Sequence, residues 1–217
     1  MSVLTPWGYT ITGDATTLPS ILSVADFNTM TANKYTGDTR VPSMLAAAEM
    51  AVRNWCGWHV ADSQPCELVN VIQSLHFTRC GPDYLIQLPA RYVSSVQRVF
   101  FNAERDNETD QWTGDEYEFF CTTGGLLRVY NVGSVPRVSG VCVQYTAGLP
   151  DALAGDIKEL IAHRVTHALA SPYGVQSEAA GGVSVTYNAT WINNSRATAL
   201  PDDNKAVLAP YRLEEVL

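Results

Sequence analysis

Residues 141–170 read VCVQYTAGLPDALAGDIKELIAHRVTHALA, a strand followed directly by a long helix. The opening run VCVQYT is short and rich in β-branched and aromatic residues, which favours a strand. Gly148 turns the chain, and Pro150 begins the first turn of a helix expected over Asp151–Ser171. Asp151 and Asp156 lie near the positive end of that helix dipole. One apolar stripe is expected to face the core, made of Leu153, Ile157, Leu160, Ile161, Val165 and Leu169.

Further strands are expected upstream, from about Cys66 to Thr146. The candidates are CELVNVIQ, YLIQL, SVQRVFF, EYEFF and LLRVY, which are separated by Gly, Pro, Asp and Asn. Gly124-Gly125 predicts a hairpin turn between the last two. The segment from Glu104 to Glu118 is rich in Asp and Glu and is interpreted as a solvated acidic loop.

Helices are predicted on both sides of the strands. Pro42 and an apolar face predict a helix that Gly57 ends; this face comprises Val41, Leu45, Ala48, Val52 and Trp55. A shorter helix is expected from Asp26 to before Gly37. VSVTY, from Val183 to Tyr187, alternates as a strand does, and Pro201 with Asp202 opens a last helix through Leu208.

This order of elements predicts an α+β fold, with a small helical bundle core, an inserted antiparallel β-rich region and a C-terminal helix. The expected segments are an N-terminal arm (1–19), the first part of the helical core (20–62), the β-rich insertion (63–146), a long core helix (147–175), a loop with a β-hairpin (176–197), and a C-terminal helix and tail (198–217).

Composition excludes several functions. The 217 residues carry a net charge of -8, with 14 basic and 22 acidic residues, so gripping nucleic acid by its phosphates or binding an anionic membrane is disfavoured. No apolar run approaches the ~20 residues of a spanning helix, and no signal peptide is evident. Five cysteines without a Cys-x-x-Cys pair favour a reducing compartment and no disulfide framework.

Sequence motifs for catalysis are missing, including the Gly-rich phosphate loops and the nucleophile elbow. The strongest candidate for a chemical site is a metal site on the long helix. It consists of His163 and His167, four residues apart, with Glu159 one turn earlier. Two imidazoles at this spacing can share a metal ion. The surrounding AHRVTHALA lacks the context of a metallohydrolase. Two polar residues on the less buried side of the helix explain the pattern better, so no catalytic, cofactor or metal site is expected.

Several stretches, in this order, resemble a known family. They are a helix ending NWCGW, the strands YLIQLPARYVSSVQRVFF, the junction VCVQYTAGLPD leading into DIKELIAHRVTHAL, the turn SEAAGGVSVTY and the closing LAPYRL. From about Thr16 onward the chain is similar to the head–tail connector (adaptor) proteins of long-tailed double-stranded-DNA bacteriophages. The strand region is larger than in the smallest members, and the arm before Thr16 has no counterpart that we can assign.

The resemblance implies a structural subunit of the virion neck, made in the host bacterial cytoplasm, and no enzyme. It implies a ring of this chain, expected to be dodecameric, that binds the portal protein and a downstream neck or tail-completion protein. Helices would surround a channel through which double-stranded DNA passes without sequence-specific binding. A non-basic channel suits such a conduit, because it does not retain phosphates. No cofactor and no membrane contact are implied.

The C-terminus holds more apolar residues than a solvated tail needs. Its expected interface residues, together with an anchor in the preceding loop, are Trp191, Val207, Leu208, Tyr211, Arg212, Leu213, Val216 and Leu217. Two outcomes stay open, packing on the same subunit and docking on the portal or a neighbouring subunit.

Three other functions stay open as well. One is another phage neck or tail-completion protein. The second is a cytoplasmic metal-dependent enzyme using His163 and His167. The third is a β-rich carbohydrate- or protein-binding module using Trp112 and the acidic loop. The long helix Asp151–Ser171 and the C-terminal helix fit such a module poorly.

Overall fold

The computed structural model describes residues 2–13, 16–69, 77–105, 112–132, 141–170, 177–180, 183–186 and 200–213. The chain forms two compact units, each built from separated segments. Unit 1 comprises residues 1–19, 57–150 and 213–217, and unit 2 comprises residues 20–56 and 151–212. The combination of helices with antiparallel sheets confirms the predicted α+β class and its C-terminal helix.

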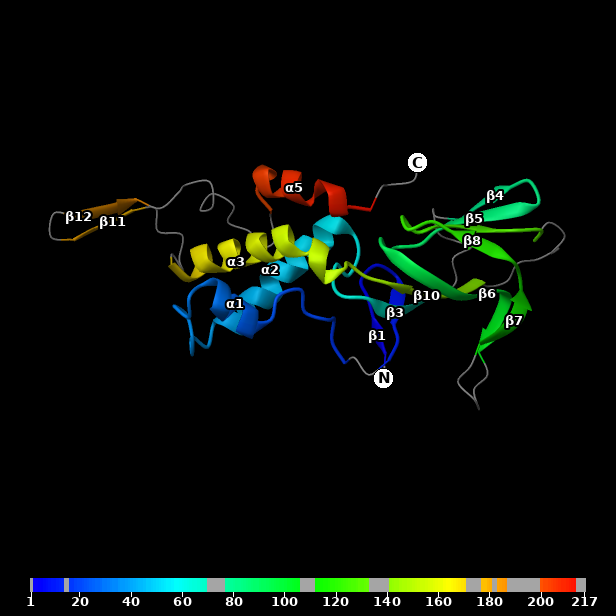
Figure 1. The fold of residues 1–217 in the computed structure, drawn as a ribbon, viewed down its shortest axis with the longest axis horizontal. Coiled ribbons are helices and arrows are strands. Elements are labelled where there is room, and N and C mark those ends of the chain that lie inside the picture. Colours follow the sequence, from blue (N-terminus) through cyan, green and yellow to red (C-terminus); the bar gives the residue numbers. More distant parts are fainter. Residues whose placement is uncertain are drawn as a thin grey trace. The chain divides into compact units, whose positions relative to one another are not determined.

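Unit 1 is built from two antiparallel sheets (Figure 1). The larger sheet has the strand order β1-β2-β3-β10-β6-β7, and the smaller has the order β4-β5-β9-β8. Their bounds are β1 (Val3–Leu4), β2 (Tyr9–Ile11), β3 (Gln64–Val69), β4 (Phe77–Cys80), β5 (Asp83–Gln87), β6 (Val93–Arg105), β7 (Trp112–Glu116), β8 (Phe119–Cys121), β9 (Leu126–Val129) and β10 (Val141–Ala147).

The two sheets of unit 1 pack through aromatic side chains. Phe101 of β6 is fully buried, and its ring lies 5.6 Å from that of Tyr84 and 5.3 Å from that of Tyr117, centroid to centroid. The predicted turn at Gly124-Gly125 joins β8 to β9, and Gly125 has a φ of +85°. A Cβ there would lie 2.5 Å from the carbonyl oxygen of Ala90, so only glycine fits.

Two segments of unit 1 differ from the sequence-based expectation. The N-terminal arm is part of the larger sheet, because β2 pairs with β3 in the register Ile11↔Cys66. The acidic stretch from Glu104 to Glu118 contains the edge strand β7, which pairs with β6; residues 106–111 lie outside the described residues. Charged side chains on an edge strand are a common protection against sheet-to-sheet association.

A buried polar contact holds β2 in unit 1. The Tyr9 hydroxyl lies 2.7 Å from Nδ1 of His59 and 3.0 Å from the backbone nitrogen of His59. Nε2 of His59 lies 3.2 Å from the carbonyl oxygen of Ala147, which can only accept, so this nitrogen carries the proton and Nδ1 accepts from Tyr9. Both side chains are almost completely buried, which makes the loss of either partner costly.

Tyr9→Phe is therefore expected to lower the free energy of unfolding by about 2–4 kcal/mol, because it removes one partner from two buried groups of His59. Chemical denaturation measures the loss. Tyr35→Phe is the matched control, since the Tyr35 hydroxyl is buried and has no hydrogen-bond partner in the described part of the chain. Equal effects of the two substitutions would contradict the proposed role of the Tyr9 hydroxyl.

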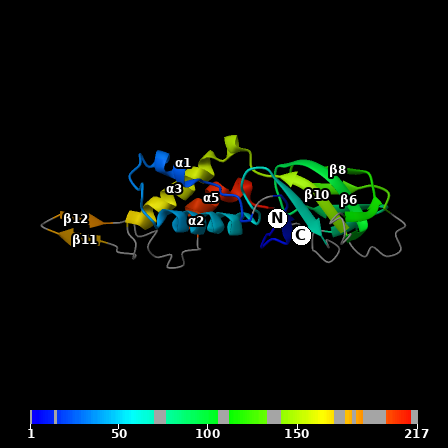
Figure 2. The ribbon, with the colours of Figure 1, turned by 90° about the horizontal axis from the view of Figure 1, so that it is seen from below.

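Unit 2 is helical. Its elements are α1 (Val24–Met30), α2 (Val41–Cys56), the 3-10 turn η2 (Asp151–Leu153), α3 (Gly155–Ala170), the hairpin β11 (Ser177–Ala180) and β12 (Val183–Thr186), α5 (Asp202–Leu208) and the 3-10 turn η3 (Ala209–Tyr211). Figure 2 shows α5 lying along α2 and α3, with which it packs. Within the described residues, no helix is long and apolar enough to cross a membrane.

The predicted helix from Asp151 is divided into two elements. Residues 151–153 form η2, and the α-helix begins only at Gly155. From Ile157 onward the predicted stripe is buried, but Leu153 is 47% exposed because the 3-10 turn breaks the helical phase.

Glu49 joins α2 to the segment that precedes α1. Its Oε1 accepts hydrogen bonds from Ser20 Oγ at 2.8 Å and from the backbone nitrogens of Ile21 and Leu22 at 3.0 and 2.9 Å. Its Oε2 lies 3.4 Å from Nη2 of Arg53, and both side chains are buried. This carboxylate therefore satisfies three donors and a buried cation in unit 2.

Candidate functional site

The two histidines of the metal hypothesis lie side by side on α3. Their ring centroids are 4.5 Å apart. In the parts of the chain that the structure describes, no group of three or more His, Cys, Asp or Glu side chains is placed to hold a metal ion. Burial, followed by the neighbouring His163, lowers the pKa of His167 below its ordinary value of 6.5. Among the described residues, the geometry places no third ligand beside His163 and His167.

The lowered pKa of His167 predicts a pH dependence of stability. Between the folded-state pKa and 6.5, the folded chain binds fewer protons than the unfolded chain, so acidification through this range favours unfolding. We expect the free energy of unfolding to fall below about pH 6.5, and the fall to be smaller in His167→Gln. Denaturation at several pH values measures both slopes, and identical slopes would contradict this assignment.

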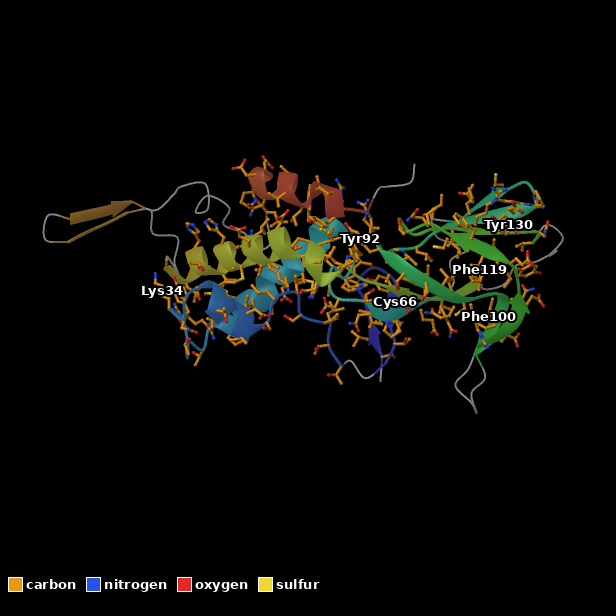
Figure 3. All side chains as sticks on the ribbon, in the orientation of Figure 1. Lys34, Cys66, Tyr92, Phe100, Phe119 and Tyr130 are labelled. Atoms are coloured by element: carbon orange, nitrogen blue, oxygen red, sulfur yellow. The ribbon has the colours of Figure 1, made fainter. Side chains whose placement is uncertain are left out.

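The burial and the raised thiol pKa values among the cysteines are those of packing residues and not of reactive nucleophiles. Cys66 and Cys142 are buried, and burial raises the pKa of Cys66 to about 12. Cys66 is labelled among the side chains of unit 1 in Figure 3. Burial also raises the pKa of Cys121, which is half-buried, to about 11. A raised pKa keeps a thiol protonated, which is the opposite of what a nucleophile needs.

The C-terminal segment, residues 200–213, is the region in which most predicted interface residues lie. Pro201 precedes α5, and Asp202 and Asp203 occupy its first turn, as predicted. Lys205 Nζ lies 2.7 Å from Asp202 Oδ1. A helix this short is marginal alone in water, so α5 depends on its packing against α2 and α3.

Five of the eight predicted interface residues lie in the described residues. Leu208 is fully buried and Tyr211 is 9% exposed, so both side chains pack within their own subunit. Val207 is 43% exposed. Leu213 belongs to unit 1 and lies against Gly57 of the same unit. Trp191, Val216 and Leu217 lie outside the described residues.

Arg212, also on the predicted interface, contacts Trp55 of α2. Its Cζ lies 4.9 Å from the centroid of the Trp55 ring, and Lys205 Nζ lies 5.3 Å from the same centroid. Each such cation–π contact contributes ~0.5–1 kcal/mol at an exposed site. Trp55 thus helps to fix the C-terminal segment on α2, whereas the sequence assigned it only to the apolar face of that helix.

Two exposed apolar side chains, Leu153 and Val207, lie beside or on this segment. The Tyr211 hydroxyl donates to the carbonyl oxygen of Leu153 at 3.2 Å, so the tip of the Tyr211 side chain reaches η2. Val207 lies near the end of α5, four residues before Tyr211, and Val207 and Leu153 are 43% and 47% exposed. We call Leu153, Val207 and the rim of Tyr211 the C-terminal patch. The sequence predicted Val207 and Tyr211 as interface residues but Leu153 as a core residue.

The chain matches one family model and is similar to chains in solved structures. The family model described as "HCP: Head completion protein" matches residues 20–213. A solved structure described as "Neck of native GTA particle computed with C12 symmetry" contains a chain with a TM-score of 0.52 and 19% identity, over 94% of this chain and 96% of that one. Another, "Neck of empty GTA particle computed with C6 symmetry", gives a TM-score of 0.49 and 17% identity over the same shares. No curated protein matches.

Proposed function

The chain belongs to the head completion protein family, and from this premise we propose that it is a structural subunit of a phage neck, located where the capsid joins the tail. The family match carries the proposal, because it spans residues 20–213 and thus both units. This membership confirms the resemblance to phage head–tail connector proteins found in the sequence. The likeness to a chain of a neck structure supports the fold on which the proposal rests.

We further propose that the subunits form a closed ring beneath the portal protein and contact a downstream neck or tail-completion protein. Rings arise when two different surfaces of one chain meet head to tail and the rotation closes. The proposed role is structural and not catalytic, and it requires no cofactor. The C-terminal patch is the part of unit 2 that we assign to contact with the portal.

The distribution of charge supports a conduit for DNA. Unit 2 contains eight basic and nine acidic residues, whereas unit 1 contains six basic and thirteen acidic residues. The helical unit is therefore nearly neutral at -1, and the β-rich unit carries the remaining -7. A nearly neutral helical wall would neither bind phosphates tightly nor hold a counterion layer that slows the duplex.

Duplex DNA is accordingly expected to bind the purified chain no more tightly than the weak end of non-specific binding, about 10⁻⁴ M at physiological salt. The reason is that the chain has 14 basic against 22 acidic residues, so few cations are available to release counterions. A gel-shift titration at several salt concentrations measures this. Tight binding with a steep salt dependence would contradict the conduit proposal.

The ring proposal is tested by mixing the full chain with the portal protein of the same phage. Native mass spectrometry and electron microscopy are expected to show rings of this chain bound to the portal. A chain that remains monomeric and unbound at high concentration would overturn the proposal.

A further inference from the structure

We propose that the outer face of the four-stranded sheet in unit 1 is a docking surface for an amphipathic, basic segment of a different protein. This inference rests on the proposed function, because the partner would be another protein of the phage neck. It concerns a surface distinct from the C-terminal patch, which lies in unit 2.

The strand register brings three apolar residues together on this face. Phe120 of β8 and Leu85 of β5 both lie opposite Arg128 of β9, one on each side. Leu126 lies two residues before Arg128, on the same face and diagonal to the other two. Phe120 is 58% exposed and Leu126 is 40% exposed, while Leu85 is half-buried. We call Leu85, Phe120 and Leu126 the outer-sheet patch.

The opposite face of the same sheet is already occupied. Ile86, Leu127 and Val129 are fully buried, and Tyr84 packs on Phe101 of β6. In Figure 3, Phe119 is labelled on the side toward β6, and Tyr130 is labelled away from it. An antiparallel sheet with one buried face normally presents polar residues on the other face. An exposed Phe and an exposed Leu close together on that face therefore indicate a surface that another molecule covers in the assembly.

Polar contacts fix the geometry around the outer-sheet patch. Arg128 donates to Asp83 Oδ2 through Nε at 2.9 Å and Nη2 at 2.6 Å, and its Cζ lies 5.3 Å from the centroid of Tyr130. Asp83 Oδ1 also accepts from the backbone nitrogen of Asn131 at 3.1 Å. Arg128 is thus held by its own subunit, and its aliphatic stem extends the apolar surface between Phe120 and Leu85.

Charge decides the kind of partner. Unit 1 has a net charge of -7, and among its described residues Asp62, Glu104, Asp115 and Glu118 are exposed. Glu118 lies beside the patch, because its carbonyl accepts from the backbone nitrogen of Tyr130. A second copy would bring the same negative excess, and the tail of this chain, Glu214-Glu215-Val216-Leu217, is also acidic. Complementarity therefore favours a lysine- or arginine-bearing segment of another protein.

A helix is the form in which such a segment would cover the sheet face, because an open sheet face is commonly buried under a helix. Apolar residues along one side of the helix would contact Phe120, Leu126 and Leu85. Basic residues at its margin would approach Glu118.

The test uses the full chain and three synthetic peptides as probes: an amphipathic Lys/Leu helix, a scrambled peptide of the same composition, and the helix with Glu in place of Lys. Calorimetry measures binding. We expect the Lys/Leu helix to bind, and Phe120→Ser with Leu126→Ser to weaken it at least about tenfold. Leu4→Ser is the matched control, because Leu4 is 74% exposed on β1 of the same unit and should leave binding unchanged.

Several outcomes would overturn the proposal. They are equal binding of the scrambled peptide, tighter binding of the Glu peptide, no loss in the double variant, or self-association of the wild-type chain that the double variant abolishes. Ring formation on the portal is measured in parallel with the same variant. If the double variant still forms rings but no longer binds the peptide, the outer-sheet patch is separate from the ring contacts. If the wild-type chain forms no rings, that result counts against the proposed function and not against the docking surface.

Discussion

Glu49→Ala is expected to lower the free energy of unfolding by about 3–5 kcal/mol, the largest loss that we predict for a single substitution. Removing the carboxylate takes the buried ion pair with Glu49 away from the guanidinium of Arg53. It also leaves the backbone nitrogens of Ile21 and Leu22 without their acceptor. Chemical denaturation measures the loss, and amide exchange at Ile21 and Leu22 should become faster.

Two comparisons make the Glu49 prediction specific. Glu159→Ala removes an exposed carboxylate from α3 of the same unit and should change stability by less than about 0.5 kcal/mol. Glu49→Leu combined with Arg53→Met removes both buried charges and should recover part of the stability lost in Glu49→Ala. The account of this ion pair fails if Glu49→Ala resembles Glu159→Ala.

Leu153→Asp combined with Val207→Asp is expected to weaken binding to the portal by at least about a hundredfold, roughly 2.7 kcal/mol. The two residues are the exposed members of the C-terminal patch, and a carboxylate in an apolar contact loses its hydration without gaining a partner. The melting temperature should change little, because neither side chain is part of the core.

Val24→Asp provides the matched control for the patch, since Val24 is 41% exposed on α1 of the same unit. Pull-down or calorimetry with portal compares the three proteins. If the double variant binds like the wild type, or if Val24→Asp causes the same loss, the C-terminal patch does not contact the portal.

The elements that the sequence predicted well are those with strong local signals. Residues Val41–Cys56 form the expected helix, because Pro42 and the apolar spacing act within a few turns. The turn at Gly124-Gly125 is likewise a local requirement of backbone geometry. The long helix was predicted over most of its length, but the 3-10 turn before it was not, which is why Leu153 was assigned to the core.

The features that were missed depend on residues far apart in the chain. The strand Tyr9–Ile11 is too short to show a period, and it is stabilised by β3 and His59, about fifty positions away. Trp55 meets Lys205 and Arg212 only after folding, so its helical spacing could not reveal the cation–π contacts. Glu49 sits on the apolar face of its helix, where its partners Ser20, Ile21 and Leu22 could not be identified from sequence.

A reconstruction of the neck of the intact phage particle, with this chain carrying a visible tag, would locate the chain in the virion. We expect a ring of tagged subunits between the capsid vertex and the tail, with DNA or its exit path along the ring axis. Tagged chains found in the capsid shell or tail tube, or absent from particles that are nevertheless complete, would contradict it.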